Sequence, residues 1–308
     1  MIKLKTFGSF TVGNGLTSVQ EGAWRSEKLE KLFVYLAMNR NRGVCIEDIS
    51  EAIWQVEEET DNPVGALKNL AYRLRKALRD ASFGEECIVS VRGGLYKWND
   101  DVEVTIDVEE FDRYINEAEM AFCRSKETAI ESYEKAIALY HGDFLPLRTD
   151  THWFMTLNAF YHSRYVNTVK ALAKLYIDTG CYEKLEQLCT RAIVYERSDE
   201  QIYSYLIVAR MRTKKVQMAF DTYETAKAIM DKDLGVRKTV MLNKVYEELL
   251  SVTKGASSYN IDEVKDDISE ESMNGVFMCG YPVFKEIYQL EVRKSARSTI
   301  PESLVLVT

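Results

Sequence analysis

The first twenty residues follow the two-residue hydrophobic period of β-strands. Apolar side chains stand at alternate positions, at Ile2 and Leu4 and again at Phe10 and Val12. The turn-forming sequence Gly13-Asn14-Gly15 directly follows the second pair. Alternation bounded by such a turn is typical of paired strands. The pattern therefore predicts a short antiparallel sheet at the start of the chain.

Three stretches with the helical period of 3.6 residues follow this sheet. Ser26 is suitably placed as the N-cap of a first helix that reaches Met38. A second, shorter amphipathic stretch covers residues 46–54. A third begins near Pro63, a residue that is favoured in the first helical turn, and continues to about Ala81.

The third predicted helix has two chemically different faces when its residues are spaced at 100°. One stripe is apolar and consists of Leu67, Leu70, Ala71, Leu74 and Leu78. The opposite side carries Lys68, Asn69, Tyr72, Lys76 and Arg79, with Arg73 and Arg75 on the flanks. The stretch from Asn62 to Arg79 contains no acidic residue. One side is expected to pack on a core, while the other presents a local charge of +5.

Two apolar segments after this helix, residues 88–92 and 95–98, are separated by Gly93-Gly94 and predict a β-hairpin. The sequences Tyr72-Arg-Leu-Arg-Lys-Ala-Leu78 and Val89-Ser-Val-Arg-Gly-Gly-Leu-Tyr96 together resemble the recognition helix and wing of the OmpR-type DNA-binding domain. The resemblance implies a winged helix-turn-helix fold for residues 1–100.

Residues 109–250 have an almost wholly helical pattern with an internal repeat. Two stretches superpose at a period of 34 residues, which places Thr179 on Thr213 and starts equivalent helices at Tyr182 and Val216. A period of 34 residues is that of tetratricopeptide helix pairs. Stacked pairs of this kind commonly present a groove, and we favour an interaction role for this part.

An earlier copy of the repeat, residues 128–136, is followed by Tyr140-His-Gly-Asp-Phe-Leu-Pro146. Behind an OmpR-like domain, this sequence resembles the bacterial transcriptional activation domain of SARP-type regulators. The resemblance implies that residues 105–252 form a tetratricopeptide-like activation domain. In that family the domain is linked to activation and oligomerisation.

The end of the chain differs in composition. Residues 253–274 are mostly small, polar and acidic, which is typical of a flexible linker. Residues 275–308 predict a strand, a helix and a strand, a βαβ-like fragment that resembles the start of a GGDEF-like domain but lacks its signature loop. The expected fold class is thus mainly α with small β elements: a winged helix-turn-helix, an α-helical repeat domain and a short α/β segment.

Composition and charge modify this picture. The chain has 308 residues, of which 46% are hydrophobic and 29% charged, as in folded proteins of two or three domains. Its net charge of −8 argues against a polyanion as partner. However, residues 1–100 carry 14 basic and 14 acidic side chains, so the excess acidity lies after residue 100. A signal peptide and a membrane-spanning apolar run are both lacking, so we expect a cytoplasmic protein without a membrane partner.

The basic helix supplies the candidate site for DNA. Side chains that can reach base edges in the major groove are Lys68, Asn69, Tyr72 and Lys76. Phosphate contacts are expected from Arg73, Arg75 and Arg79, with Arg92 and Lys97 of the hairpin at flanking phosphate or minor groove. The competing interpretation is a solvated basic face on an ordinary core helix. The amide and aromatic among the cations favour DNA. We expect residues 1–100 alone to bind it at low salt.

Catalytic patterns are missing from the sequence. Its six cysteines and three histidines have no metal-ligand spacing, and it has neither a P-loop nor a nucleophile elbow. We therefore expect no enzyme, no cofactor and no metal. The expected partners are double-stranded DNA, RNA polymerase and a second copy on repeated half-sites. Two alternatives stay open: a protein interaction scaffold, and a nucleotide-sensing regulator that acts through the C-terminal segment.

Overall fold

The computed structural model describes residues 1–55, 62–83, 87–90, 94–148, 150–234, 239–256, 287 and 290. Residues 1–253 form one compact unit, and residues 254–308 are a separate one. The strands are β1 (Ile2–Lys5), β2 (Thr11–Gly13), β3 (Ser18–Gln20), β4 (Ile88–Ser90), β5 (Tyr96–Trp98) and β6 (Val104–Ile106). The N-terminal helices are α1 (Glu27–Met38), α2 (Ile46–Ile53) and α3 (Pro63–Asp80). The remaining helices are α4 (Asp107–Ala121), α5 (Lys126–Leu139), α6 (His152–Thr179), α7 (Tyr182–Tyr195), α8 (Glu200–Arg212), α9 (Val216–Leu234) and α10 (Val240–Ala256).

The N-terminal sheet has the strand order β3-β2-β1-β6. The predicted antiparallel pair is confirmed, because Leu4 of β1 lies opposite Val12 of β2. The sequence pattern did not reveal β3 and β6. Strand β6 runs parallel to β1, with Ile106 opposite Leu4, and so brings the chain back to its own start. The sheet is therefore mixed rather than purely antiparallel.

The three predicted helices of the N-terminal part form within one or two residues of the expected bounds. Ser26 occupies the N-cap of α1, but its side chain makes no capping hydrogen bond. Helix α1 packs against both α2 and α3. Its Phe33 is fully buried and meets the Trp98 ring of β5 edge to face, with ring centroids 5.5 Å apart. Helix α1 is thus the central support of this part.

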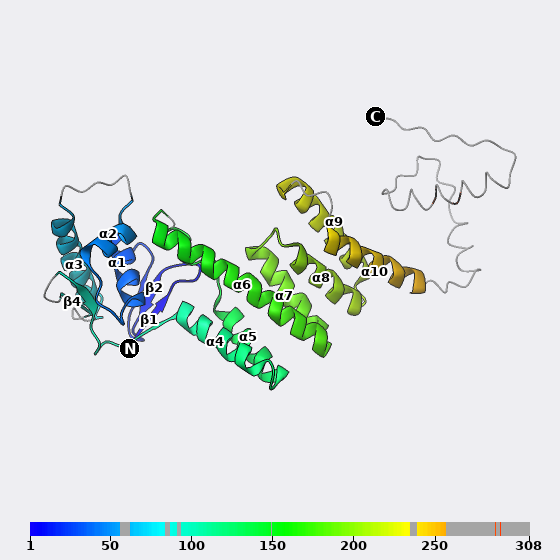
Figure 1. Cartoon of the computed structure of the whole chain (residues 1–308), viewed down its shortest axis with the longest axis horizontal. Coiled ribbons are helices and arrows are strands. Elements are labelled where there is room, and N and C mark those ends of the chain that lie inside the picture. Colours follow the sequence, from blue (N-terminus) through cyan, green and yellow to red (C-terminus); the bar gives the residue numbers. More distant parts are fainter. Residues whose placement is uncertain are drawn as a thin grey trace, which may run out of the picture. The chain divides into compact units, whose positions relative to one another are not determined.

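Helices α4 to α10 continue as a row of neighbouring helices, drawn from green to orange in Figure 1. Consecutive helices α4 to α9 pack pairwise. Helices α7 and α9 begin at Tyr182 and Val216, which confirms the 34-residue spacing. Helix α10 extends to Ala256, beyond the expected start of the linker at residue 253. Apart from residues 287 and 290, residues 257–308 lie outside the described residues, so the linker, the C-terminal fragment and the domain bounds stay predictions.

The loop Tyr140–Pro146 crosses the start of the chain at very short range. The Gly8 amide donates to the Asp143 carbonyl oxygen over 2.9 Å, and Phe7 forms a β-bridge with Phe144. Gly8 has φ +80°, and a Cβ atom there would lie 2.5 Å from the His141 carbonyl oxygen. Only glycine fits this crossing. The loop that carried the family resemblance therefore fastens the helical part to the N-terminal part.

A buried carboxylate and a shared aromatic cluster strengthen this connection. The Asp107 carboxylate, at the start of α4, accepts hydrogen bonds from the Thr6 amide (2.7 Å), the Thr6 hydroxyl (2.6 Å) and the Phe7 amide (2.9 Å). The Phe7 ring packs against Phe111 and Tyr140, with centroids 5.2 and 4.9 Å away. Residues on both sides of position 100 thus belong to one hydrophobic core.

Candidate nucleic-acid interface

Helix α3 has the local sequence needed to begin where it does. The Asn62 side chain accepts a hydrogen bond from the Gly65 amide over 2.8 Å, and Pro63 occupies the first turn. Both are features of stable helix N-termini. The buried residues of α3 are the predicted apolar stripe, Leu67, Leu70, Ala71, Leu74 and Leu78. The assignment of the inward face is therefore confirmed.

The opposite face of α3 is open to solvent. Its exposed side chains are those of Lys68, Asn69, Tyr72, Arg73, Lys76 and Arg79. Tyr72 is 64% exposed, so its ring and hydroxyl are open to solvent. Asp80, at the last position of the helix, is its first acidic residue. The structure therefore gathers a cationic face that also offers an amide and a phenol.

Arg75 lies between the two faces. It is half-buried, and its Nε atom donates to the Ile88 carbonyl oxygen over 3.1 Å. This hydrogen bond connects α3 to strand β4. Its expected phosphate contact stays a prediction, and the connection to β4 gives Arg75 an additional role in positioning the hairpin.

The two strands of the predicted hairpin are present and paired, and they are held at two points; residues 91–93 lie outside the described residues. Strands β4 and β5 are antiparallel, with Ile88 opposite Trp98. Tyr96 exchanges two backbone hydrogen bonds with Val44, at 2.7 and 2.8 Å, and the Trp98 indole donates to the Val102 carbonyl oxygen over 2.8 Å. The structure thus fixes the base of the hairpin on the loop before α2.

Of the two basic residues expected on the hairpin, the structure describes Lys97 but not Arg92. Lys97 lies on β5 and forms an ion pair with Asp100, so part of its charge is compensated locally. Arg92 lies outside the described residues. Because no observation of the structure tests DNA contact by either residue, both assignments stay predictions.

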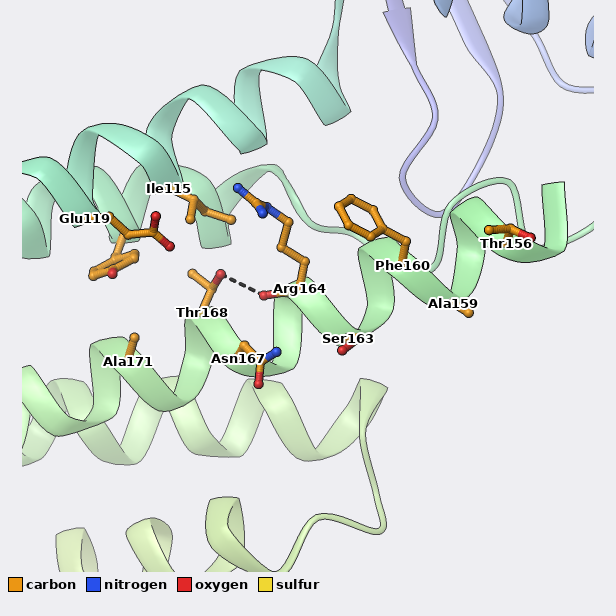
Figure 2. A pocket seen from close by; sticks show the side chains of 11 residues that line it. Ile115, Glu119, Thr156, Ala159, Phe160, Ser163, Arg164, Asn167, Thr168 and Ala171 are labelled. Atoms are coloured by element: carbon orange, nitrogen blue, oxygen red, sulfur yellow. Dashed lines mark hydrogen bonds between the residues drawn. The ribbon is translucent and has the colours of Figure 1, made fainter. Parts of the chain in front are cut away.

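A hollow between α4, α5 and α6 is the site that sequence reasoning did not locate. It has a volume of about 550 Å³. Figure 2 shows Ile115 and Glu119 of α4 facing Arg164 and Phe160 of α6 across it. Phe160 is 48% exposed, so the hollow has an apolar edge. The available signal was Phe160, an apolar residue on the solvent side of α6, which a search for buried stripes passes over.

Reactive chemistry is poorly represented in the described part of the chain. There, no three His, Cys, Asp or Glu residues are grouped to hold a metal ion. Cys87 and Cys189 are buried, whereas Cys123 is exposed. Burial raises the pKa of Cys87 to about 11 and also raises the pKa of Cys189. No helix among the described residues is both long and apolar enough to cross a bilayer.

His162 belongs to a cluster of charged groups instead of a ligand site. Its Nδ1 atom lies 2.8 Å from an Asp143 carboxylate oxygen and its Nε2 atom 3.1 Å from one of Glu196. The Tyr140 hydroxyl also donates to Asp143 over 2.6 Å. The hydrogen bond with Asp143, opposed by burial and supported by Glu196, raises the pKa of His162 to about 9. Protonated His162 therefore joins α6, the loop after α5 and the end of α7.

The helical part has a recognisable class. Residues 106–250 match the family model of the bacterial transcriptional activator domain, which begins at the end of β6 and covers the helices up to most of α10. The match does not include α1, α2 or α3, so it leaves the winged helix-turn-helix interpretation of the N-terminal part as a prediction. Residues 106–250 are thus similar to a domain described in bacterial transcriptional activators.

Two relatives extend the comparison toward the N-terminus. The transcriptional regulator RedD of Streptomyces coelicolor is 23% identical over 238 residues, which cover 76% of this chain and 67% of RedD. The structure of Mycobacterium tuberculosis EmbR in complex with a low-affinity phosphopeptide superposes with a TM-score of 0.63 at 19% identity. That match covers 83% of this chain and 68% of EmbR, and at this identity it shows the fold alone.

Proposed function

We propose that this protein is a sequence-specific DNA-binding transcription regulator, and an activator, that reads DNA with helix α3. The observation that supports this most is the cationic face of α3, opposite a wholly buried apolar stripe. The second support is the match of the helical part to the bacterial transcriptional activator domain.

The face of α3 suits a major groove. An α-helix fits that groove, where lysine and arginine reach guanine acceptors and asparagine bridges adenine. We assign the contacts with base edges to Lys68, Asn69, Tyr72 and Lys76. We assign phosphate contacts on either side to Arg73 and Arg79, and a phosphate contact near the hairpin to Arg75. Such contacts fix register, while the base contacts give specificity.

The helical part supplies the second half of the proposal. It mediates self-association or contact with RNA polymerase, and the hollow between α4, α5 and α6 is the surface offered for it. A dimer would then place two α3 helices on repeated half-sites. The scaffold alternative differs in one respect, since a scaffold has no affinity for duplex DNA.

The decisive experiment measures affinity for promoter duplexes by fluorescence anisotropy over a range of salt concentrations. Five or six phosphate contacts give a log-log slope of about −5, because each contact contributes about −0.9. The double variant Arg73→Ala/Lys76→Ala is expected to lower the affinity, and the loss of the Arg73 phosphate contact should reduce the slope by about 1.

The matched control is Lys244→Ala, which removes an exposed lysine of α10 far along the chain. It should leave both affinity and slope unchanged. A wild-type chain that binds no duplex at low salt, or a slope near zero, would refute the proposal and favour the scaffold.

A further inference from the structure

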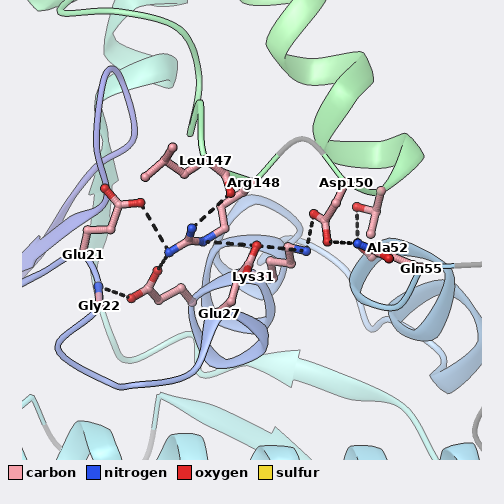
Figure 3. Close-up of polar contacts among 11 residues, drawn as sticks. Glu21, Gly22, Glu27, Lys31, Ala52, Gln55, Leu147, Arg148 and Asp150 are labelled. Atoms are coloured by element: carbon pink, nitrogen blue, oxygen red, sulfur yellow. Dashed lines mark hydrogen bonds and ion pairs between the residues drawn. The ribbon is translucent and has the colours of Figure 1, made fainter. Parts of the chain in front are cut away.

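Two consecutive residues of α1 carry opposite charges and are almost completely buried. Glu30 and Lys31 each have side chains only 2% exposed. Their partners come from the loop before α6: Arg148 pairs with Glu30 and Asp150 pairs with Lys31. Figure 3 shows Lys31, Arg148 and Asp150 together with Glu21, Glu27 and Gln55 around them. We refer to Glu30, Lys31, Arg148 and Asp150 as the latch.

Both carboxylates of the latch accept a further hydrogen bond. The Gly22 amide donates to Glu30 over 2.8 Å, and the Gln55 side chain donates to Asp150 over 2.9 Å. Burial opposes ionisation of Asp150, but the hydrogen bonds from Lys31 and Gln55 outweigh it and lower its pKa. Asp150 is therefore charged at neutral pH. The two ion pairs lie next to each other, because Glu30 and Lys31 are consecutive residues. We therefore expect both ion pairs to form and to break at the same time.

Separating either ion pair of the latch is costly. The attraction between the charges weakens, while Glu30, Lys31 and Arg148 stay largely out of water, at 2%, 2% and 10% exposure; Asp150 is 31% exposed. Water can compensate the three buried charges only after the surrounding packing opens. The latch therefore favours a closed arrangement or a fully opened one, and an element with two arrangements can transmit a change between two parts of a molecule.

On one side, the latch is connected to the proposed DNA-reading helix. Helix α1 carries Glu30 and Lys31 and packs directly against α3 and β5. Phe33, two positions after Lys31, contacts Trp98 at the base of the hairpin. A shift of α1 therefore displaces the support of both α3 and the hairpin.

On the other side, the latch is connected to the helical part through the start of α6. The Thr151 hydroxyl donates to the Ala52 carbonyl oxygen over 2.8 Å, and the Trp153 ring meets Tyr35 edge to face at 4.8 Å. Helix α6 has 28 residues and spans about 42 Å. Further along, its Phe160 and Arg164 line the hollow of Figure 2. Occupation of that hollow would act on a helix whose first turn is fixed to α1 and α2.

We propose that the latch is the coupling element through which the helical part controls α3. This inference rests on the proposed function, because it concerns the regulation of the same DNA-reading face. A ligand or partner on α6 shifts the latch, and DNA on α3 must shift it in return, since coupling between two binding sites is reciprocal.

The test is hydrogen exchange of the full chain, with and without duplex DNA. In the wild type, DNA is expected to slow amide exchange in the first turns of α6 by about fivefold or more. In Asp150→Ala, which leaves Lys31 with only Glu27 at 3.5 Å, this effect should vanish while α3 itself is still protected. The swapped pair Lys31→Glu/Asp150→Lys should restore part of it.

The matched control is Asp178→Ala, which removes the exposed ion pair with Lys126 at 2.9 Å and should retain the wild-type response. Without DNA, Asp150→Ala is expected to speed exchange in both α1 and α6 and to leave α8 and α9 unchanged. If exchange rises in all helices because the variant is unfolded, the isosteric Asp150→Asn replaces it. The inference is overturned if DNA protects α6 equally in the Asp150 variants, or if faster exchange is confined to residues beside position 150.

The two proposals fail in different ways. A wild type that binds no duplex DNA refutes the proposed function. In that case hydrogen exchange of Asp150→Ala without DNA still tests the latch. Faster exchange in α1 and α6 together is what the latch requires, and faster exchange in only one of them would overturn the inference.

Discussion

The cations of α3 lie in water, whereas those of the latch are withdrawn from it. Lys68, Arg73 and Lys76 are exposed on α3. Lys31 is 2% exposed and Arg148 10%, and each faces carboxylates within ion-pair distance. Both groups consist of lysine and arginine. Those of the latch have lost their contact with water, so their charges act within the fold and are not accessible to a partner. An exposed cation loses almost nothing on folding and stays available to a polyanion, while a buried one stabilises the fold only as long as its partner is present.

The largest expected effect comes from separating the two regions at residue 100. A fragment of residues 1–100 lacks β6, Asp107 and Arg148, which leaves an unpaired strand edge and a buried Glu30 without its arginine. We expect it to show no cooperative thermal transition by circular dichroism, whereas residues 1–253 unfold cooperatively. The structure thus argues against the expectation that residues 1–100 act alone. Cooperative unfolding of the short fragment would show that the shared core is dispensable.

The second effect concerns one cation of the latch. Arg148→Ala leaves Glu30 buried without a counter-charge, so the free energy of unfolding in urea should fall by about 3–5 kcal/mol. Arg113→Ala is the control, since Arg113 and its partner Glu117 are both about half exposed, and it should change that free energy by ~0.5 kcal/mol or less. Similar losses in the two variants would contradict the distinction between buried and exposed cations.

The third effect depends on pH. The folded-state pKa of His162, at about 9, lies above its ordinary value of about 6.5. Its stabilising contribution is therefore complete below pH ~6.5 and is lost as the pH rises through about 9. We expect a loss of about 1–2 kcal/mol over this range, after allowance for partial exposure. The free energy of unfolding of His162→Gln in urea should lack this part of the pH dependence. If its pH profile equals that of the wild type, His162 does not contribute to the pH dependence of stability.

The smallest effect on stability is expected on α3. The triple variant Lys68→Ala/Arg73→Ala/Lys76→Ala removes three exposed charges and should change the free energy of unfolding by only about 0.5 kcal/mol. The same variant should bind duplex DNA far more weakly. A large loss of stability would mean that this face is needed for folding, which would weaken its assignment to DNA.

Local sequence patterns sufficed for much of the fold. The apolar stripe of α3 and the 34-residue spacing of α7 and α9 were predicted because both depend on helical periodicity, which is a local property. Strand β6 escaped prediction because its partner β1 lies about 100 residues earlier. The hollow beside α6 escaped because its lining comes from three helices.

The sequence by itself determined which residues of α3 face inward and that a +5 face belongs to the N-terminal part. It did not distinguish Lys31 and Arg148 from the exposed cations, because the period of α1 places Lys31 beside apolar neighbours and says nothing of Asp150, 119 residues later. Only the tertiary structure decided which charges are buried and paired. The physical reason is that desolvation and Coulomb attraction depend on distance in space, whereas local patterns record distance along the chain.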